Sequence, residues 1–440
     1  MKKLFSCVFF FFTLVHFAFA DLTIHIVQGV NKPYPIAIVP FGHDVTTSVT
    51  PTGLTGVITN DLANSGRFSA LPVSQMPADP TQVLEFNWQQ WNSANTGVEY
   101  AVVGNVIPGT KTGTYKVTFA LLSLLSNKPM IGQEYDNVTP SQLRLLAHQI
   151  SDVVYQTITG VPGYFRTRLA YVQVFNRGTS HTVWELTVSD YDGFNPHVLL
   201  KQKGNPIASP TWSPDGKQIA YVSYVNNRQA IFTITLSTGV RRIIANFPGM
   251  NSAPAWSPDG KYIAMALSGT DSSDQSDLYV MNLKTRELKR YTTYGNNTSP
   301  SWSPDGKTIA FNSNRGGTPQ IYALNLTSKQ IYRLSYSGVA NYAPVYTPNG
   351  QNLVIMSQQI SGGPIRLATL NIASNTINII TTGVLDKSPS VAPNGDMVVY
   401  ANYDASKGIL AETSLDGTVQ INLPAIAGTV QSPAWSPFLN

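Results

Sequence analysis

Residues that commonly carry chemistry are sparse in this chain and form no catalytic pattern. The sequence contains six histidines, none in His-x-x-x-His spacing, and a single cysteine, Cys7. It has no Gly-x-Ser-x-Gly nucleophile elbow, no Gly-x-x-x-x-Gly-Lys-Ser/Thr phosphate loop and no His-Glu-x-x-His zinc motif. We therefore predict no catalytic residue, no metal site and no cofactor, and we expect a protein that is not an enzyme.

Three aspartates, Asp215, Asp259 and Asp305, recur in a way that could suggest a calcium site. Each stands in the sequence Ser-Pro-Asp-Gly-Lys. A calcium loop needs several oxygen ligands at alternating positions, and these segments do not provide them. Ser-Pro-Asp-Gly instead favours a type I turn, because proline presets φ at the second position and glycine suits the last. We interpret the aspartates as turn residues.

These turns belong to an internal repeat, Ser/Ala-Pro-x-Trp-Ser-Pro-Asp-Gly-Lys. Its aromatic position recurs every 44 to 46 residues, at Trp212, Trp256, Trp302, Tyr346, Val391 (where the motif is worn) and Trp435. A fixed period of this length is typical of solenoids and propellers. Each repeat has room for four short antiparallel strands and for no crossover helix, so neighbouring units must stack to bury their faces.

The two ends of the repeat series favour a closed ring. The sixth copy stops after its first strand, whereas residues 169–174, 183–189 and 197–200 resemble second, third and fourth strands that lack a first. The C-terminal strand is predicted to complete this first unit. We therefore predict that residues 165–440 form a six-bladed, all-β propeller closed by the C-terminal strand.

Residues 21–160 contain no repeat and mix helical with strand patterns, which predicts an N-terminal α/β domain. Expected strands cover residues 36–41, 100–106, 115–125 and 132–135. Expected helices run from Leu54 to Asn64, over residues 82–91, and after Thr139, which can act as the cap. Val161-Pro162-Gly163 is interpreted as a hinge between the two domains.

The first 20 residues are predicted to be a secretory signal peptide. Lys2 and Lys3 precede an apolar run, and Ala18-Phe19-Ala20 provides small residues for cleavage between Ala20 and Asp21. Cys7 lies in this leader, so the mature chain has no thiol. The apolar run is short for a membrane span, and no later segment is long and apolar enough for one. The net charge of +5 is spread along the chain, and binding of nucleic acid is not expected.

The repeat, together with four particular stretches of the chain, resembles the TolB family of the Tol-Pal system. These stretches are PIAIVPF (35–41), FRTRLAYV (165–172), VSDYDG (188–193) and SPAWSP (432–437), and the similarity runs from Asp21 to Asn440. The resemblance implies a periplasmic adaptor without enzymatic activity. Such proteins link the outer-membrane lipoprotein Pal to the inner-membrane protein TolA, and support outer-membrane integrity and invagination during cell division. In some bacteria colicins also use the system, which makes them further candidate partners.

The resemblance and the loop sequences together predict two binding sites. The loops that lead into each repeat vary in sequence, and variable loops on a rigid scaffold are where binding usually resides. Pal is expected to bind this face of the propeller at Ser209, Met250, Asn251, Ala253, Asn297, Thr298, Asn341 and Tyr342. TolA is expected to bind a tail formed by residues 21–32, at Asp21, Leu22, Thr23, Ile24, His25 and Ile26. The alternation of apolar and polar residues in this tail also fits an edge strand of the first sheet.

Two alternatives belong to other functional classes. One is the propeller of a peptidase-like protein of the prolyl oligopeptidase type, which would need a hydrolase domain with a nucleophile elbow. The other is a ligand-binding periplasmic propeller for sugars or lipids, for which we would expect a ladder of exposed aromatic residues. The sequence contains neither feature.

Overall fold

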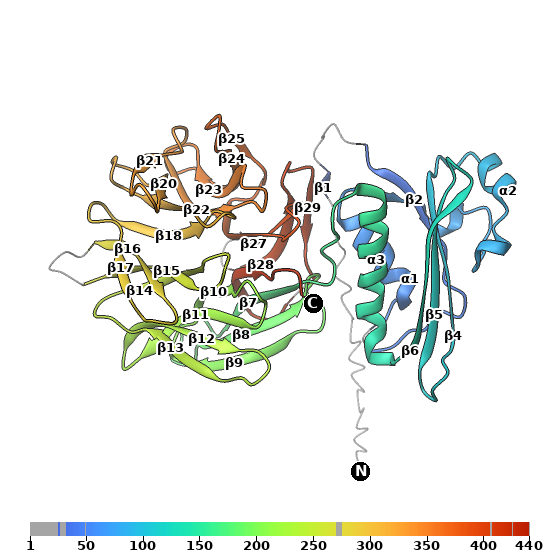
Figure 1. Cartoon of the computed structure of the whole chain (residues 1–440), viewed down its shortest axis with the longest axis horizontal. Coiled ribbons are helices and arrows are strands. Elements are labelled where there is room, and N and C mark those ends of the chain that lie inside the picture. The colour runs from blue at the N-terminus through green and yellow to red at the C-terminus, as the bar shows by residue number, and fades with distance from the viewer. Residues whose placement is uncertain are drawn as a thin grey trace, which may run out of the picture.

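The computed structural model of the chain describes residues 25–26, 32–48, 50–269, 275–404, 407–424 and 426–439. It consists of an N-terminal α/β domain packed against a propeller (Figure 1). The predicted signal peptide, its cleavage site and residues 21–24 and 27–31 of the predicted tail lie outside the described residues.

The N-terminal domain is built on a five-stranded sheet in the order β3-β2-β4-β5-β6. The strands are β2 (Tyr34–Ile38), β3 (Phe68–Ala70), β4 (Tyr100–Pro108), β5 (Tyr115–Ser123) and β6 (Lys128–Val138). Helices α1 (Gly53–Asn64) and α3 (Leu143–Thr159) cover the face that looks toward the propeller, and the short helix α2 (Trp88–Ser93) lies beyond the other face (Figure 1). In α1 the buried side chains Leu54, Val57, Ile58 and Leu62 follow the spacing of one helical face.

Two local predictions for this domain need correction. Instead of one helix over residues 82–91, a 3-10 turn (Val83–Glu85) is followed by α2, because the side chain of Asn87 accepts a hydrogen bond from Gln90 N at 3.1 Å and starts a new helix. The strand expected at residues 132–135 extends over Lys128–Val138. Thr139 does form a capping box, with Gln142, at the 3-10 turn that leads into α3.

The propeller contains six four-stranded antiparallel units. Unit 1 consists of β30 (Thr429–Trp435), β7 (Arg168–Phe175), β8 (Val183–Asp190) and β9 (His197–Lys203). Unit 2 consists of β10 (Ala208–Trp212), β11 (Gln218–Val225), β12 (Arg228–Thr235) and β13 (Arg241–Ala245), and unit 3 of β14 (Asn251–Trp256), β15 (Tyr262–Ser268), β16 (Ser276–Asn282) and β17 (Leu288–Arg290). Unit 4 consists of β18 (Asn297–Trp302), β19 (Thr308–Ser313), β20 (Gln320–Asn325) and β21 (Ile331–Arg333). Unit 5 consists of β22 (Ala340–Tyr346), β23 (Asn352–Gln358), β24 (Ile365–Asn371) and β25 (Ile377–Ile379), and unit 6 of β26 (Leu385–Val391), β27 (Met397–Asp404), β28 (Lys407–Ser414) and β29 (Val419–Asn422).

Strand pairing runs within these units rather than around them. The C-terminal strand β30 pairs antiparallel with β7, with Trp435 opposite Leu169. A single parallel pair, Ile365 with Leu385, joins units 5 and 6. The short strand β1 (His25–Ile26) pairs with β29, at the outer edge of unit 6. The alternative that the tail is an edge strand of the first sheet is therefore wrong for these two residues, because they lie on the propeller.

A β-bulge interrupts the first strand of every unit at the same position. The residue before the motif proline has a positive φ, between 47° and 55°, at Ser209, Ala253, Ser299, Ala343, Ser388 and Ser432. A side chain in this conformation is strained, which explains why only serine and alanine occur there. The Ser/Ala-Pro of the sequence repeat is therefore the signature of the bulge, and it persists in unit 6 although the tryptophan does not.

One apolar core spans the two domains. It includes Tyr155 of α3, Tyr164 and Phe165 of the connecting segment, and Tyr191 and Trp435 of unit 1. The predicted hinge at residues 161–163 is held in place, since Asn394 Nδ2 of unit 6 donates to Pro162 O at 3.0 Å. The domains therefore meet through a packed junction.

The burial of Trp435 yields a prediction about stability. Its indole lies edge-on to Tyr164, with ring centroids 5.5 Å apart, and its Nε1 donates to Thr167 Oγ1 at 2.7 Å. We expect Trp435→Ala to lower the free energy of unfolding by about 3–5 kcal/mol, because it leaves a large cavity in the shared core. Chemical denaturation of the mature chain measures the change. The control is Phe438→Ala, at an exposed position three residues away; similar losses for both variants would contradict the prediction.

Candidate functional site: the loop face of the propeller

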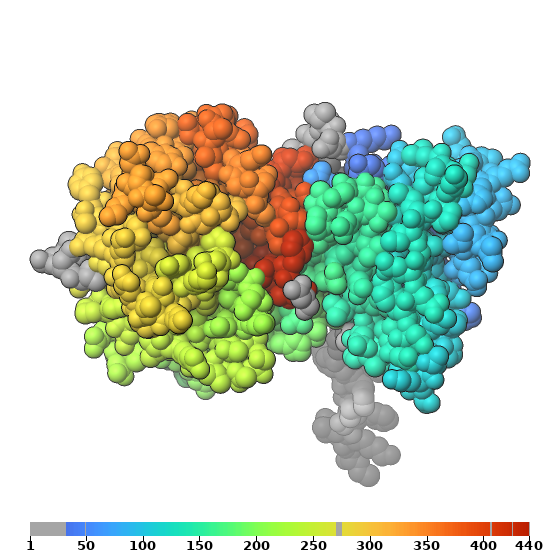
Figure 2. Space-filling view, in the orientation of Figure 1, coloured from blue at the N-terminus to red at the C-terminus, as the bar shows by residue number. Residues whose placement is uncertain are grey.

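The propeller has two faces, and the N-terminal domain covers part of only one. The turn face carries the Ser-Pro-Asp-Gly turns and the turns between third and fourth strands. Arg67 Nη2 contacts Asp396 Oδ1 at 2.8 Å on this face, and Arg144 pairs with Asp192 in the β8–β9 turn. Figure 2 shows the N-terminal domain against the C-terminal part of the propeller, with the units of the middle of the chain farther away.

The opposite face, which we call the loop face, is the candidate functional site. It carries the loops between successive units and the loops between second and third strands. No hydrogen bond or ion pair between described residues of the two domains involves these loops. The loop face is therefore the larger surface left open to a partner.

A buried polar residue starts the first strand of units 3 to 6 and holds the loop before it. These residues, Asn251, Asn297, Asn341 and Asp386, have an exposed fraction of 0%. In unit 3, Asn251 accepts from Phe247 N at 2.9 Å and donates to Phe247 O at 2.8 Å, so one side chain closes the loop. In unit 5, Asn341 Nδ2 donates to Ser337 O at 2.8 Å in the same way.

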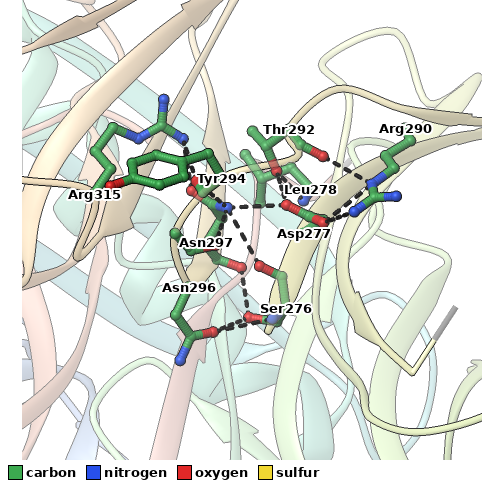
Figure 3. Close-up of polar contacts among 10 residues, drawn as sticks. Ser276, Asp277, Leu278, Arg290, Thr292, Tyr294, Asn296, Asn297 and Arg315 are labelled. Atoms are coloured by element: carbon green, nitrogen blue, oxygen red, sulfur yellow. Dashed lines mark hydrogen bonds and ion pairs between the residues drawn. The ribbon is translucent and has the colours of Figure 1, made fainter. Parts of the chain in front are cut away.

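The network around Asn297 in unit 4 is the most extensive (Figure 3). Its Nδ2 donates to Gly295 O at 2.7 Å and to Asp277 Oδ1 at 3.1 Å, while its Oδ1 accepts from Arg315 Nη2 at 2.7 Å. Asp277 in turn pairs with Arg290 and accepts from Thr292 Oγ1 at 2.7 Å. The loop is thus fixed to two neighbouring strands through buried, charge-assisted hydrogen bonds.

Burial perturbs the charged members of these networks. Desolvation raises the pKa of Asp386 in unit 6, and hydrogen bonds from Thr381 and Asn402 partly offset the effect. Desolvation likewise lowers the pKa of Arg315. Both shifts disfavour charge. Asp386 is fully buried and belongs to the scaffold beneath the surface, whereas Arg315 is half-buried at the edge of its loop.

The structure places the predicted Pal-binding residues on the loop-face side of equivalent strands but changes the role of several. Asn251, Asn297 and Asn341 are fully buried, and their side chains shape the loops instead of contacting a partner directly. Ser209 and Ala253 are bulge residues. Met250, Thr298 and Tyr342 remain half-buried at the start of their strands and are the predicted residues best able to touch a partner.

The loops carry exposed apolar side chains that the sequence analysis missed. Four of them lie in units 4 to 6 or in the loops before those units, with exposed fractions of 69% for Tyr294, 62% for Tyr336, 65% for Ile360 and 75% for Val384. Arg333 lies over the ring of Tyr336, 5.2 Å from its centroid. Aromatic and arginine side chains on a held surface are the composition of binding hot spots. Tyr294, Tyr336 and Val384 lie in the loop just before the buried Asn or Asp of the next unit. Their position before that residue is the sequence signal that could have identified them.

The described residues offer one group with the composition of a metal site, at the domain junction. Ligand atoms of Asp61, His148 and Asp192 lie within 4.8 Å of one another. Asp61, however, already accepts hydrogen bonds from Tyr191 and His148, and Asp192 pairs with the guanidinium of Arg144. These partners satisfy the carboxylates, so we assign no metal there. Within the described residues, no helix is both long and apolar enough to span a membrane.

Comparison with known proteins defines the class. Residues 155–439 match the family model "TolB beta propeller domain", and residues 22–130 match "TolB amino-terminal domain". The architecture is thus that of the two-domain propeller proteins of the Tol-Pal system.

Comparison with individual proteins gives the same result as the family models. The chain is 37% identical over 444 residues to the Tol-Pal system protein TolB of Francisella tularensis subsp. tularensis (strain FSC 198), covering 99% of this chain and 98% of the relative. It is 37% identical over 441 residues to the protein of the same name from Hydrogenovibrio crunogenus, covering all of both chains. The crystal structure of TolB from Acinetobacter baumannii matches with a TM-score of 0.83 and 34% identity, over 95% of this chain and all of that one. The chain belongs to the TolB family, which confirms the resemblance found in the sequence.

The buried network in unit 4 leads to a second prediction. Asn297→Ala removes a partner from both Asp277 and Arg315, and an unsatisfied buried polar group is costly. We expect the free energy of unfolding to fall by about 2 kcal/mol. Denaturant titration measures this, with Thr293→Ala, at an exposed residue of the same loop, as the matched control. Equal stability of the two variants would mean that the network does not hold the loop.

Proposed function

We propose that this protein is a periplasmic, non-enzymatic adaptor of the Tol-Pal system that links a Pal-type lipoprotein to TolA. In this role it supports outer-membrane integrity and invagination during cell division. The observation that carries the proposal concerns the loop face. The N-terminal domain leaves this face uncovered, and its loops, which buried hydrogen bonds fix in place, carry exposed apolar side chains. The names of the relatives and the predicted signal peptide support the setting.

We also propose that the six units close into a ring through the C-terminal strand. The first strands of successive units contact one another from β10 to β14, β18, β22 and β26, and β30 contacts both β26 and β10. Such a ring would give the loop face a rigid frame, which lowers the entropic cost of ordering an interface on binding.

The Pal-type lipoprotein is proposed to bind the loop face around units 3 to 6. Met250, Thr298 and Tyr342 stand at the strand starts, and Tyr294 and Tyr336 project from the loops beside them. Because buried hydrogen bonds hold these loops, a partner meets a preformed surface instead of ordering it.

TolA is proposed to bind the N-terminal tail by strand addition. His25 and Ile26 pair with Gln420 and Val419 on the edge strand β29, next to a cavity of about 570 Å³ between the domains. A strand at the edge of a sheet can exchange one sheet for another, since the main-chain hydrogen bonds are the same in either place. Occupation of the loop face would then favour one position of the tail, with a reciprocal coupling of about 1–3 kcal/mol.

The loop-face proposal is tested by a pair of tyrosine substitutions in unit 4 and in the loop that follows it. Tyr336 is exposed in the loop, whereas Tyr332 is exposed on the outer strand β21, away from this face. We expect Tyr336→Ala to raise the Kd for the soluble domain of the lipoprotein at least tenfold by removing a hot-spot side chain, measured by calorimetry. Tyr332→Ala should leave the Kd unchanged. A loss of affinity only in the control would place the binding site elsewhere.

The tail proposal is tested by removing residues 22–32 from the mature chain. We expect binding of the soluble TolA domain to be lost, because the adding strand is gone, while the lipoprotein affinity stays within about threefold of the parent. Each partner is titrated with and without the other, and Phe438→Ala at the opposite end of the chain is the control. TolA affinity that survives the deletion would refute this assignment of the contact.

A further inference from the structure

A buried histidine lies at the centre of the contact between the two domains. His148 of α3 and Asp61 of α1 are 2% and 1% exposed, and His148 Nδ1 lies 2.8 Å from Asp61 Oδ2. The other oxygen of Asp61, Oδ1, accepts a hydrogen bond of 2.7 Å from the hydroxyl of Tyr191. Because Tyr191 belongs to the β8–β9 turn of unit 1, Asp61 connects the histidine to the propeller.

The other charged groups around His148 come from both sides of the junction. Arg144, one helical turn earlier in α3, pairs with Asp192 and has its Nε 3.4 Å from Asp190 Oδ2. The ring of Tyr191 meets the imidazole edge-on, with centroids 5.5 Å apart. A further carboxyl group, that of Glu412 on β28, is 2% exposed in the adjacent part of the propeller.

The charge balance of this cluster depends on one proton. Asp61, Asp190 and Asp192 face the guanidinium of Arg144 and the imidazole of His148, and Arg168 acts on Asp190 from the neighbouring strand. With a neutral imidazole, no cation lies directly against Asp61, whereas an imidazolium provides one. An uncompensated carboxylate in a poorly solvated site is costly, so the closed junction favours the protonated form.

We propose that His148 is a proton-sensitive lock between the domains: its protonated form holds α1 and α3 against the β8–β9 turn, and its deprotonation loosens that contact. The device needs no movement within either domain. It acts through the chain of contacts His148–Asp61–Tyr191, which crosses the junction beside the pair of Arg144 and Asp192.

The pKa shifts of the groups in this cluster agree in direction with the proposed lock. Burial alone would lower the pKa of His148, but the adjacent Asp61 carboxylate, its hydrogen bond and Asp192 together raise that pKa above the ordinary value of 6.5. Burial also raises the pKa of Asp190 and of Glu412. A group that binds its proton more tightly in the closed state favours closure. His148 and Asp61 belong to the same domain, so the part of this raised pKa that depends on closure comes from Asp192 of the propeller. This contribution favours closure while His148 is protonated and is lost as the pH rises through its raised pKa.

The test follows the histidine and the junction in the same mature protein. Ring resonances of labelled histidines are titrated from pH 5 to 9 by NMR, with His148 assigned by its loss in His148→Gln. We expect His148 to titrate at a higher pH than the exposed His181 and His197. Over the same range, amide protection from hydrogen exchange should fall in α3 and in residues 190–195, by about tenfold for each pH unit that separates the closed and open pKa values.

Matched variants separate this lock from a general pH effect. In His148→Gln, which keeps a neutral polar side chain beside Asp61, protection of the junction should no longer depend on pH. In His181→Gln the wild-type dependence should remain. If His148→Gln fails to fold, the NMR titration of His148 and the pH dependence of amide hydrogen exchange in the wild-type protein test the proposal on their own. A His148 that titrates at or below the exposed histidines, or a junction whose protection is constant across the range, would overturn the proposal.

Discussion

The apolar core shared by the two domains is the constraint on which the rest of this structure depends. Tyr164 and Phe165 of the connecting segment pack with Tyr155 of α3 and with Tyr191 and Trp435 of unit 1. These large side chains are buried only when the N-terminal domain lies against the turn face, near the point where the first and last strands of the propeller meet. The same contact that stabilises the junction therefore determines which face of the propeller remains open.

Polar groups at this junction set its orientation, which apolar packing alone would leave loosely defined. Tyr155 donates to Asp396 Oδ2 at 2.6 Å while Arg67 contacts the other oxygen, so that one carboxylate of unit 6 is held by two elements of the N-terminal domain. Asp61 is the converse case: this carboxylate belongs to the N-terminal domain and accepts a hydrogen bond from the hydroxyl of Tyr191 in unit 1. Removing one member of such a pair leaves its partner buried and unsatisfied, which penalises alternative orientations of the domains.

Features that depend on residues adjacent in the sequence could be predicted, whereas features that depend on distant residues could not. The turns and bulges of the propeller depend on a few adjacent residues, so Ser-Pro-Asp-Gly and Ser/Ala-Pro revealed the repeat and its strands. The junction depends on residues as far apart as Asp61, His148 and Tyr191, which share no motif or spacing, and only the folded chain brings them together. The asparagines of the loops were predicted to contact a partner and are instead buried against their own loops, because an amide that binds a partner and one that binds its own loop look alike in a sequence.

The loop networks show how a repeated scaffold acquires surfaces that differ from unit to unit. The loops before units 4, 5 and 6 are each held by a set of three groups, which come from the third strand of the preceding unit, from the loop itself and from the first strand of the unit. The sets are Asp277, Thr292 and Asn297; Gln320, Ser335 and Asn341; and Arg366, Thr381 and Asp386. In the first set the acidic side chain, Asp277, lies on the third strand of the preceding unit, whereas in the last set the acidic side chain, Asp386, lies on the first strand of unit 6 and the cation Arg366 lies on the third strand of the preceding unit. Because each loop is satisfied internally by its own set, its exposed residues are free to vary without loss of the fold. Such a surface can be specific for one partner although the units beneath it are built alike.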